Sequence, residues 1–409
     1  MQETPKASRL HIAILGRRNA GKSSLINALT NQKVALVSDV PGTTTDPVYK
    51  AMEILPIGPV MIIDTAGIDD SGCLGTLRVE RTMSVLNKAD LVIIVLEAES
   101  GITQYEKALI EGIKVKKIPI VGVINKTDKI TIAAELVMKW SKEFNIPLLP
   151  TSVKNSQGIE ELKKLIITYA PPDWQGPPVI GDLIQAKDTI ILVTPIDSAA
   201  PKGRLILPQV QTIRDILDHD GVTIVVKETE LKQAIENLRK LPRLIVTDSQ
   251  AFERVSAETP SGVMLTSFSI LFARHKGDLE TLVSGVKNIE KLKPGDTVLI
   301  AEACTHHQQA DDIGTVKIPR WLQKKVGGEL NFEWAAGSHF PEDLSKYSLI
   351  IHCGACMLNR KEMLYRLSEV TNKAVPVVNY GILIAYINGI LEQALEPFPQ
   401  IQRILSELN

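Results

Sequence analysis

The chain has 409 residues, of which 44% are hydrophobic and 23% are charged, and its formal net charge is −1. At roughly 100–200 residues per domain, this length predicts two to four domains, each able to bury a core. The near-neutral charge excludes a strongly basic protein of the kind that binds nucleic acid constitutively.

The N-terminal segment, the longest apolar stretch and the cysteines predict the cellular compartment of the protein. The N-terminal residues MQETPKASRLHIAIL lack the basic segment, long apolar core and cleavage site of a secretory signal. The longest apolar stretch, starting at Val375, is interrupted by Pro376, Asn379 and Asn388, which favours a buried strand and helix over a membrane span. The four cysteines, three of them after residue 300, fit a reducing compartment where thiols bind metal. We therefore expect a cytoplasmic protein without a membrane partner.

The first part of the chain alternates apolar runs with helix-like segments. Strands are predicted at residues 10–16, 59–67, 90–98, 118–126 and 146–152, and helices at 22–30 and 130–144. This alternation is typical of a mostly parallel sheet covered by helices. The stretch APPDWQGPP, residues 170–178, has too little apolar periodicity for a helix or strand. We therefore assign residues 1–172 to a first α/β domain.

Two further α/β domains are predicted after this stretch. Strands at 189–197, 222–228 and 243–249, separated by helices at 208–220 and 228–241, predict a small domain at residues 179–262. A helical run over residues 261–292 leads into a third domain, residues 263–409. Its predicted strands lie at 296–304, 347–355 and 374–380.

The segment GRRNAGKS, residues 16–23, follows a predicted strand and opens a predicted helix. It fits the phosphate-binding pattern G-x-x-x-x-G-K-[ST], in which backbone N–H groups cradle phosphate oxygens. Lys22 is expected to reach the β- and γ-phosphates, and Ser23 to bind Mg²⁺. The residues of this loop predicted to bind nucleotide are Asn19, Ala20, Gly21, Lys22, Ser23 and Ser24.

Three later motifs complete a GTP site. In DTAG, Asp64 is expected to hold the water shell of Mg²⁺, and the Gly67 amide to sense a γ-phosphate. The segment NKTD (Asn125, Lys126, Asp128) resembles the guanine-reading N-K-x-D of GTPases, whose Asp accepts from the guanine N1–H and amino group. The segment TSVK, containing Ser152, Val153 and Lys154, resembles the S-A-K loop that supports the base. The expected ligands are GTP and GDP.

The segment PGTTTDP, residues 41–47, resembles the P-G-T-T-x-D stretch of the translation-factor-related GTPases typified by the tRNA-modifying protein MnmE. This resemblance implies that Thr45, or the adjacent Thr43 or Thr44, binds Mg²⁺. Together with Lys22 of the phosphate loop and with Asp64 and Gly67 of DTAG, Thr45 is a catalytic candidate. Asn19 matches the asparagine that binds K⁺ in potassium-activated members; a simple polar turn residue is the alternative. Ile68 replaces the water-orienting Gln of Ras-like enzymes, so we expect slow hydrolysis that K⁺ accelerates by placing positive charge on the transition state.

Three cysteines lie at the ends of two predicted strands of the third domain. Cys304 ends the first of these strands, and Cys353 and Cys356 lie at the end of the second. Because ligands bind outside the carboxyl ends of strands in open α/β sheets, we expect these thiols to converge. His306 and His352 are candidate ligands or supporting hydrogen-bond donors. Spacing alone leaves open a structural zinc site and a cubane iron–sulfur cluster with one free iron.

The GTPase motifs, followed by CTH at residues 304–306 and HCGAC at 352–356, together resemble the FeFe-hydrogenase maturation GTPases, the HydF family. This resemblance implies that Cys304, Cys353 and Cys356 bind a 4Fe-4S cluster, with His306, His352 or solvent at the fourth position. It implies a scaffold or carrier that passes a transient di-iron subcluster precursor to apo FeFe-hydrogenase, alongside the radical-SAM maturases. The middle domain would form a homodimer.

A second hypothesis is a ribosome- or RNA-maturation GTPase with a structural zinc tail. The tail shows no basic surface interleaved with aromatic residues, which a nucleic-acid partner would favour. Iron and sulfide, rather than one zinc, would distinguish the first hypothesis from the second.

Overall fold

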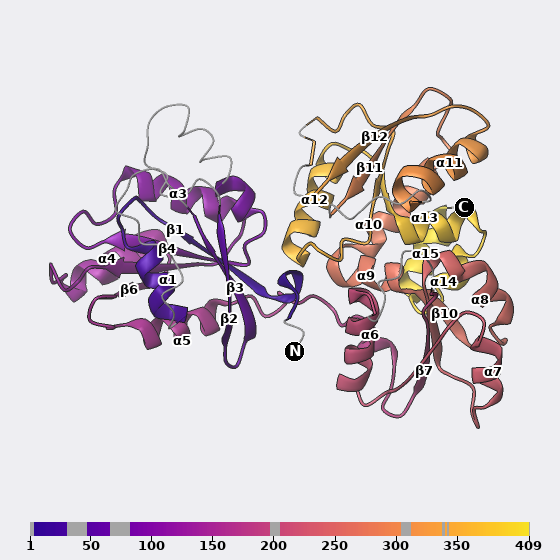
Figure 1. Ribbon diagram of the computed structural model, residues 1–409. Coiled ribbons are helices and arrows are strands. Elements are labelled where there is room, and N and C mark those ends of the chain that lie inside the picture. Colours follow the sequence, from indigo (N-terminus) through magenta and orange to yellow (C-terminus); the bar gives the residue numbers. More distant parts are fainter. Residues whose placement is uncertain are drawn as a thin grey trace. The chain divides into compact units, whose positions relative to one another are not determined.

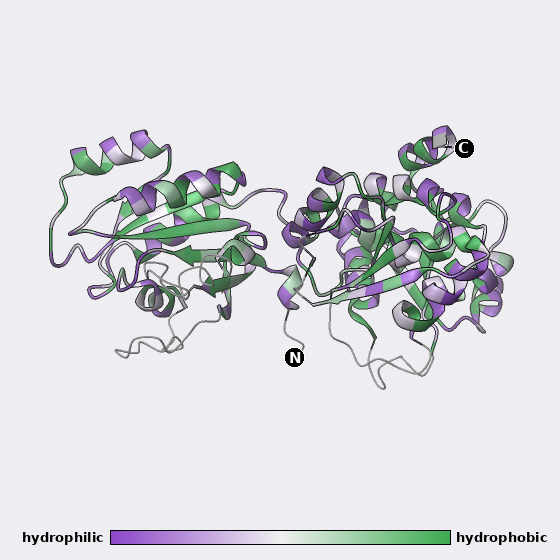
Figure 2. Cartoon of the chain, turned by 90° about the horizontal axis from the view of Figure 1, so that it is seen from above, coloured by the Kyte–Doolittle hydropathy of each residue, from purple (hydrophilic) through white to green (hydrophobic). Residues whose placement is uncertain are grey.

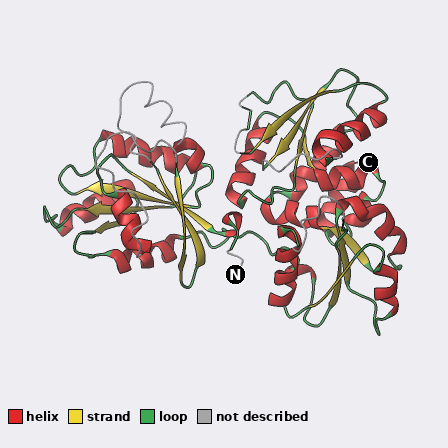
Figure 3. Cartoon of the chain, viewed as in Figure 1, coloured by secondary structure: helices red, strands yellow, loops and turns green. Residues whose placement is uncertain are grey.

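The computed structural model describes residues 4–30, 47–65, 82–196, 205–303, 312–337, 340–341 and 343–408. The chain forms two compact units, residues 1–175 and 176–409. Both units combine helices and strands (Figure 3). None of the helices in the described ranges is long and apolar enough to cross a bilayer.

The first unit contains a six-stranded sheet in the order β2-β3-β1-β4-β5-β6. Only β2 is antiparallel to its neighbour. The strands are β1 (Leu10–Leu15), β2 (Val48–Ile54), β3 (Gly58–Asp64), β4 (Leu91–Glu97), β5 (Ile120–Asn125) and β6 (Leu148–Pro150). The parallel strands therefore direct their carboxyl ends to one edge of the sheet, where ligands of open α/β sheets bind.

Helices cover both faces of this sheet because its central strands are buried on both sides. Along β1, Ile12 and Ile14 belong to one apolar cluster with α1 and α5, while Ala13 and Leu15 belong to another with α3 and α4. The helices are η1 (Lys6–Ser8), α1 (Lys22–Thr30), α3 (Gln104–Val115), α4 (Ala134–Phe144) and α5 (Ile159–Tyr169). Figure 1 shows the resulting three layers.

The second unit contains two parallel four-stranded sheets, in the orders β10-β9-β7-β8 and β12-β11-β13-β14. The strands of the first sheet are β7 (Thr189–Val193), β8 (Val222–Val226), β9 (Leu244–Thr247) and β10 (Met264–Ser267). The strands of the second are β11 (Thr297–Glu302), β12 (Asn331–Ala336), β13 (Leu349–His352) and β14 (Val377–Asn379). In Figure 2 the strands are coloured mainly as hydrophobic, and the helices carry many hydrophilic residues.

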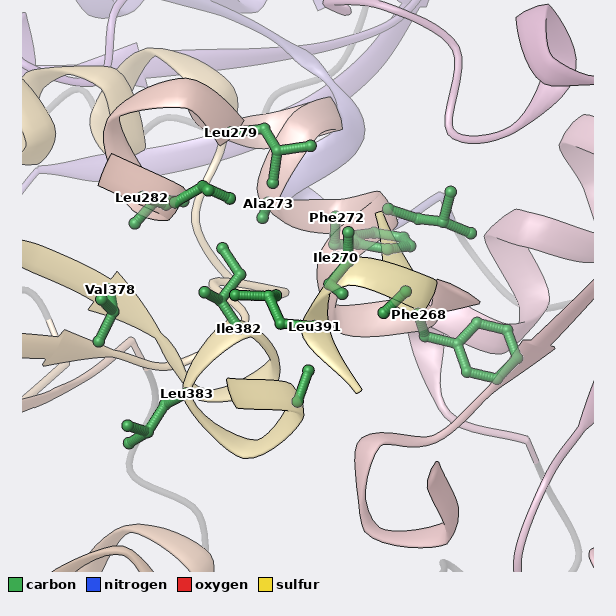
Figure 4. Packing of buried hydrophobic residues seen from close by; sticks show 14 of the residues in the cluster. Phe268, Ile270, Phe272, Ala273, Leu279, Leu282, Val378, Ile382, Leu383 and Leu391 are labelled. Atoms are coloured by element: carbon green, nitrogen blue, oxygen red, sulfur yellow. The ribbon is translucent and has the colours of Figure 1, made fainter. Parts of the chain in front are cut away.

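One apolar cluster runs through both sheets of the second unit. Its helices are η2 (Gly181–Leu183), α6 (Leu207–Asp218), α7 (Leu231–Glu236), η3 (Ser249–Ala251), α8 (Phe252–Glu258), α9 (Phe268–Lys276), α10 (Leu279–Ser284), η4 (Gly285–Asn288), η5 (Ile313–Lys317), α11 (Ile318–Val326), α12 (Arg360–Asn372), α13 (Tyr380–Ile387), α14 (Leu391–Ala394) and α15 (Pro399–Leu408). Helix α9 contacts α6, α10, α12 and α13. Figure 4 shows residues of this apolar cluster, among them Ile270 and Phe272 of α9, Ile382 of α13 and Leu391 of α14. This helix therefore joins the two sheets through buried apolar packing.

The predicted α/β fold class is confirmed, and three strands were missed. Strand β10 lies inside the segment predicted as helix, because Ser267 ends the strand and at once caps α9 by accepting a hydrogen bond from the Ile270 amide at 3.2 Å. Strands β2 and β12 are edge strands whose residues are mostly half-buried or exposed, so they lack a continuous apolar run.

The apolar stretch starting at Val375 forms strand β14 and helix α13, as predicted. Asn379 separates them, because its side chain accepts a hydrogen bond from the Ile382 amide at 2.8 Å and so caps α13. The polar residue that interrupts the stretch is therefore the start of a helix.

Candidate functional site

The phosphate loop joins β1 to α1 and packs against two neighbouring strands. Gly16 has a φ of +147°, and a Cβ there would lie 2.4 Å from the Val95 carbonyl oxygen on β4. Gly21 has a φ of +96°, and a Cβ there would lie 2.2 Å from the side-chain amide nitrogen of Asn125, the last residue of β5. Both positions thus require glycine for backbone conformation and for close approach.

The start of α1 brings Lys22 and Ser23 to the end of β3. The buried Lys22 ammonium donates to the carbonyls of Gly16 and Arg17, both at 2.8 Å. The Ser23 hydroxyl donates to Asp64 Oδ2 at 3.0 Å. Asp64 Oδ1 is buried without a hydrogen-bond partner in the described part of the protein. Burial raises the pKa of Asp64, and the Ser23 hydroxyl and the Lys22 ammonium oppose this rise.

The NKTD and TSVK segments contact each other and the phosphate loop. The Asn125 side chain donates to the Ala20 carbonyl at 3.0 Å and accepts from the Val153 amide at 3.3 Å. The Ser152 hydroxyl donates to Asp128 Oδ1 at 2.9 Å. The structure therefore brings four separate sequence motifs together at the carboxyl edge of one sheet.

Two acidic residues that the motifs did not indicate also hold this site. Arg17, inside the phosphate loop, donates to the fully buried Glu106 at 2.6 Å. Glu106 also accepts from the Thr103 amide at 2.9 Å, so it ties the loop to the start of α3. Lys126 pairs with Glu97 at the end of β4, with 2.5 Å between nitrogen and oxygen. A capping box, T-x-x-E at residues 103–106, was the available sequence signal for Glu106.

Several predicted site residues lie outside the described residues. They are Thr43, Thr44, Thr45, Gly67, Cys304 and His306. Of the other predicted residues, Asn19 has a φ of 62°, in the left-handed region within the phosphate loop, and Ser24 lies in the first turn of α1. Lys154 follows Val153 in the TSVK turn.

The two described cysteines lie in a short loop between β13 and α12. The Cys353 sulfur accepts a hydrogen bond from the Ala303 amide, just after β11, at 3.1 Å, and another from the Ala355 amide at 3.4 Å. Cys356 is half-buried. The ends of two neighbouring strands therefore meet at the Cys353 sulfur, and Cys304 is the residue that follows Ala303 in the sequence.

His352 ends β13 and has both ring nitrogens engaged within the protein. Nδ1 donates to the Cys353 carbonyl at 2.9 Å, which leaves Nε2 to accept from the Arg366 guanidinium at 3.3 Å. Burial, with a smaller contribution from Arg366, lowers the pKa of His352 to about 4. Arg366 also donates to the Gly337 carbonyl at 2.7 Å and lies 3.4 Å from Glu362.

Lys276, the last residue of α9, points its ammonium at the loop between β13 and α12, which contains Cys353 and Cys356 and is called the cysteine loop below. It is 2% exposed and donates to the carbonyls of Cys356 and Leu358, both at 2.9 Å. Burial lowers the pKa of Lys276 to about 8, and charges on the Cys356 and Cys353 sulfurs act in the opposite direction. No sequence motif indicated this residue.

Within the described ranges, no three histidine, cysteine or acidic side chains are grouped to hold a metal ion. Two of the five predicted cluster residues, Cys304 and His306, fall in the segment 304–311, which those ranges do not include.

Curated relatives match part of the chain. The tRNA modification GTPase MnmE of Nostoc sp. (strain PCC 7120) is 34% identical over 244 residues, which cover 59% of this chain and 49% of that protein. The MnmE of Geobacillus kaustophilus is 36% identical over 163 residues, covering 38% of this chain and 33% of that protein. The chain thus spans about half the length, or less, of these relatives. Among solved structures, the G domain of the T. maritima FeoB iron transporter is 27% identical and covers 40% of this chain and 99% of that chain, with a TM-score of 0.32.

Three family models match successive parts of the chain. A 50S ribosome-binding GTPase model matches residues 11–126, a hydrogen maturase F dimerization domain matches 179–277, and a hydrogen maturase F tetramerization domain matches 280–397. The two hydrogen maturase models together span more than half of the chain. The chain belongs to the hydrogen maturase F (HydF) family and carries a GTPase domain at its N-terminal end.

Proposed function

We propose that this protein is a GTP-hydrolysing scaffold that holds a 4Fe-4S cluster and carries a di-iron subcluster precursor to apo FeFe-hydrogenase. The observation that carries the proposal is the hydrogen bond from the Ala303 amide to the Cys353 sulfur at 3.1 Å. It joins the end of β11, which Cys304 follows in sequence, to the loop that holds Cys353 and Cys356. The maturase family of the chain supports the cargo and the recipient.

The chemistry of the described residues fits an iron–sulfur cluster. Thiolates are the usual protein ligands of such clusters, and hydrogen bonds to their sulfurs tune the reduction potential. The Cys353 sulfur already accepts hydrogen bonds from two backbone amides. The positively charged side chains of Lys276 and Arg366 lie beside the cysteine loop. A cluster held by Cys304, Cys353 and Cys356 would leave one iron open for an exchangeable ligand, which suits a carrier.

We propose that His352 supports the site rather than binding iron. Its Nδ1 proton is donated to a backbone carbonyl, and its Nε2 lone pair accepts from Arg366. A ligating nitrogen needs a free lone pair, so ligation by His352 would break the bond to Arg366. The fourth position then falls to His306 or solvent.

In the GTPase domain we assign the nucleotide contacts from the geometry of the described motifs. Asp128, held by Ser152, reads guanine, and Lys22 binds the β- and γ-phosphates. The Ser23 and Asp64 pair fits Mg²⁺, because Asp64 Oδ1 is buried without a partner among the described residues and can accept from a metal-bound water. Thr45, with Thr43 and Thr44 beside it, and Gly67 are the proposed switch contacts.

We predict that K⁺ accelerates GTP hydrolysis through Asn19. The left-handed backbone at Asn19, with a φ of 62°, is a conformation that asparagine adopts more readily than most residues. GTP turnover measured in KCl is expected to exceed turnover in NaCl at equal ionic strength by about tenfold or more, and Asn19→Ala should remove the difference. Equal rates of the unmodified protein in both salts would exclude the ion from the mechanism.

We propose that the protein forms a homodimer through its middle domain. Its further partners would be the radical-SAM maturases and apo-hydrogenase, and we propose no nucleic-acid partner. Strand β8 lies at the edge of its sheet and exposes Val222 (49%) and Val225 (39%). Unpaired edges with exposed apolar residues are templates for pairing with another chain. We also propose a cytoplasmic location, because the site requires reduced thiols.

Metal analysis of anaerobically purified protein tests the proposed function. We expect brown protein with iron and acid-labile sulfide in equal amounts. Colourless protein with one tightly bound zinc per chain would instead favour a ribosome- or RNA-maturation GTPase with a structural zinc tail. The two maturase-domain matches beyond residue 178 favour the iron–sulfur outcome.

A further inference from the structure

The side chain of Lys276 is hydrogen-bonded to the loop that holds the two described cysteines. Its ammonium donates to the carbonyls of Cys356 and Leu358 at 2.9 Å and reaches the Ala355 carbonyl at 3.5 Å. The three acceptors lie within four consecutive residues. A single side chain from α9 therefore holds the loop that contains both described cysteines.

Among the described residues, no carboxylate neutralises the charge of Lys276. No aspartate or glutamate in the described ranges lies within ion-pair distance of its ammonium, although the side chain is 2% exposed. Burying an ammonium group is costly unless negative charge lies nearby. Arg366, the other buried cation at the site, differs because it pairs with Glu362 at 3.4 Å.

Lys276 is also not needed to cap its own helix. The carbonyls at the end of α9 accept from Arg360, whose guanidinium lies 2.8 Å from the His275 oxygen and 3.1 Å from the Gly277 oxygen. Basic residues near a helix end often satisfy these last carbonyls. Since Arg360 already does so, the Lys276 ammonium is left to donate to the carbonyls of the cysteine loop. It also lies 5.9 Å from the centroid of the Phe272 ring on its own helix.

The loop itself adopts a conformation that requires support. Ala355, between the two cysteines, is buried and has a φ of 52°, in the left-handed region that non-glycine residues rarely adopt. Such a conformation persists where the surrounding structure holds it. The Lys276 ammonium contacts the carbonyl of Ala355 and that of the next residue, Cys356.

We propose that Lys276 is a positioning residue of the cluster site, which fixes the Cys353–Cys356 loop and supplies the positive charge that balances an anionic cluster. The charge-balancing role rests on the proposed function, because it needs a bound cluster. The role in fixing the loop does not, because it can be tested in the protein without a cluster.

The first experiment measures hydrogen exchange in the cluster-free protein. Lys276→Met removes the ammonium but keeps an apolar chain of similar length. The Leu358 amide, bonded to the Ala355 carbonyl at 3.1 Å, is expected to exchange about tenfold faster or more. The matched control is Lys240→Met, because Lys240 is exposed and lies in a loop of the same unit. Its Leu358 exchange should equal that of the unmodified protein.

The second experiment measures the midpoint potential of the reconstituted cluster by a redox titration followed by electron paramagnetic resonance. Removing a buried positive charge disfavours the more negative, reduced cluster, so Lys276→Met should shift the potential to lower values. Lys276→Arg keeps the charge and should restore it toward the original value, whereas Lys240→Met should not move it. Lys276→Gln, also uncharged, replaces Lys276→Met if the latter does not fold.

The outcomes separate the two proposals. A folded, uncharged Lys276 variant with unchanged Leu358 exchange and an unchanged potential would overturn the role of Lys276. If Lys276 has a purely structural role, its substitution would change the Leu358 exchange rate or the melting temperature but not the midpoint potential. That result would overturn the charge-balancing role. If the unmodified protein takes up no iron and sulfide, the proposed function fails, and the exchange experiment still decides whether Lys276 holds the loop.

Discussion

Replacing Lys22 by alanine is expected to lower GTP turnover by about 100- to 1000-fold, the usual loss when one charge-stabilising donor is removed from a reacting centre. The Lys22 ammonium is buried inside the phosphate loop, 2.8 Å from two of its carbonyls, so alanine removes the positive charge from the inside of this loop. Phosphate release from GTP under saturating Mg²⁺ measures the effect. Iron and sulfide content should stay at the level of the unmodified protein, because Lys22 lies in a different unit from the cysteine loop.

Lys139→Ala is the matched control for this variant. Lys139 lies on α4 of the same unit and is exposed, so its loss should leave turnover unchanged. Wild-type turnover in Lys22→Ala would show that residues 16–23 are not the phosphate site.

Replacing Cys353 or Cys356 by serine is expected to remove most of the iron and sulfide from the reconstituted protein and to abolish hydrogenase activation. Serine is a far poorer iron ligand than a thiolate, and the Cys353 sulfur also accepts the amides of Ala303 and Ala355. Cys304→Ser should behave in the same way. Iron and sulfide content, GTP turnover and activation of apo-hydrogenase are to be measured on the same preparations.

Cys73→Ser is the control, since Cys73 is the remaining cysteine of the chain and belongs to the GTPase segment of the sequence. It should keep its cluster and its activation. GTP turnover should stay within about twofold of the original in all four variants, because the phosphate loop uses no thiol. A cysteine variant with full cluster content and full activation would remove that residue from the ligand set, and three such variants would refute the cluster site.

The amino-acid sequence by itself determined the fold class and predicted where GTP binds. Both depend on local information: apolar runs alternating with helix-like segments, and short motifs whose residues lie next to one another in the sequence. The segment GRRNAGKS needed only its own glycines and the following helix to predict the phosphate loop. The structure then placed Asp64 and Asn125 next to that loop through hydrogen bonds to Ser23 and Ala20, and it joined Ser152 to Asp128.

Only the tertiary structure decided which side chains support these sites. Arg17 and Glu106 are 89 positions apart, and Lys276 and Cys356 are 80 positions apart. Such pairs form because strand order brings distant loops together, and no local periodicity records strand order. The strand β10 was missed for a related reason, since four residues with a helix directly behind them form a strand by pairing with β9. A buried lysine in an apolar helix has no sequence motif, and its importance becomes visible once the carbonyls that surround it are known.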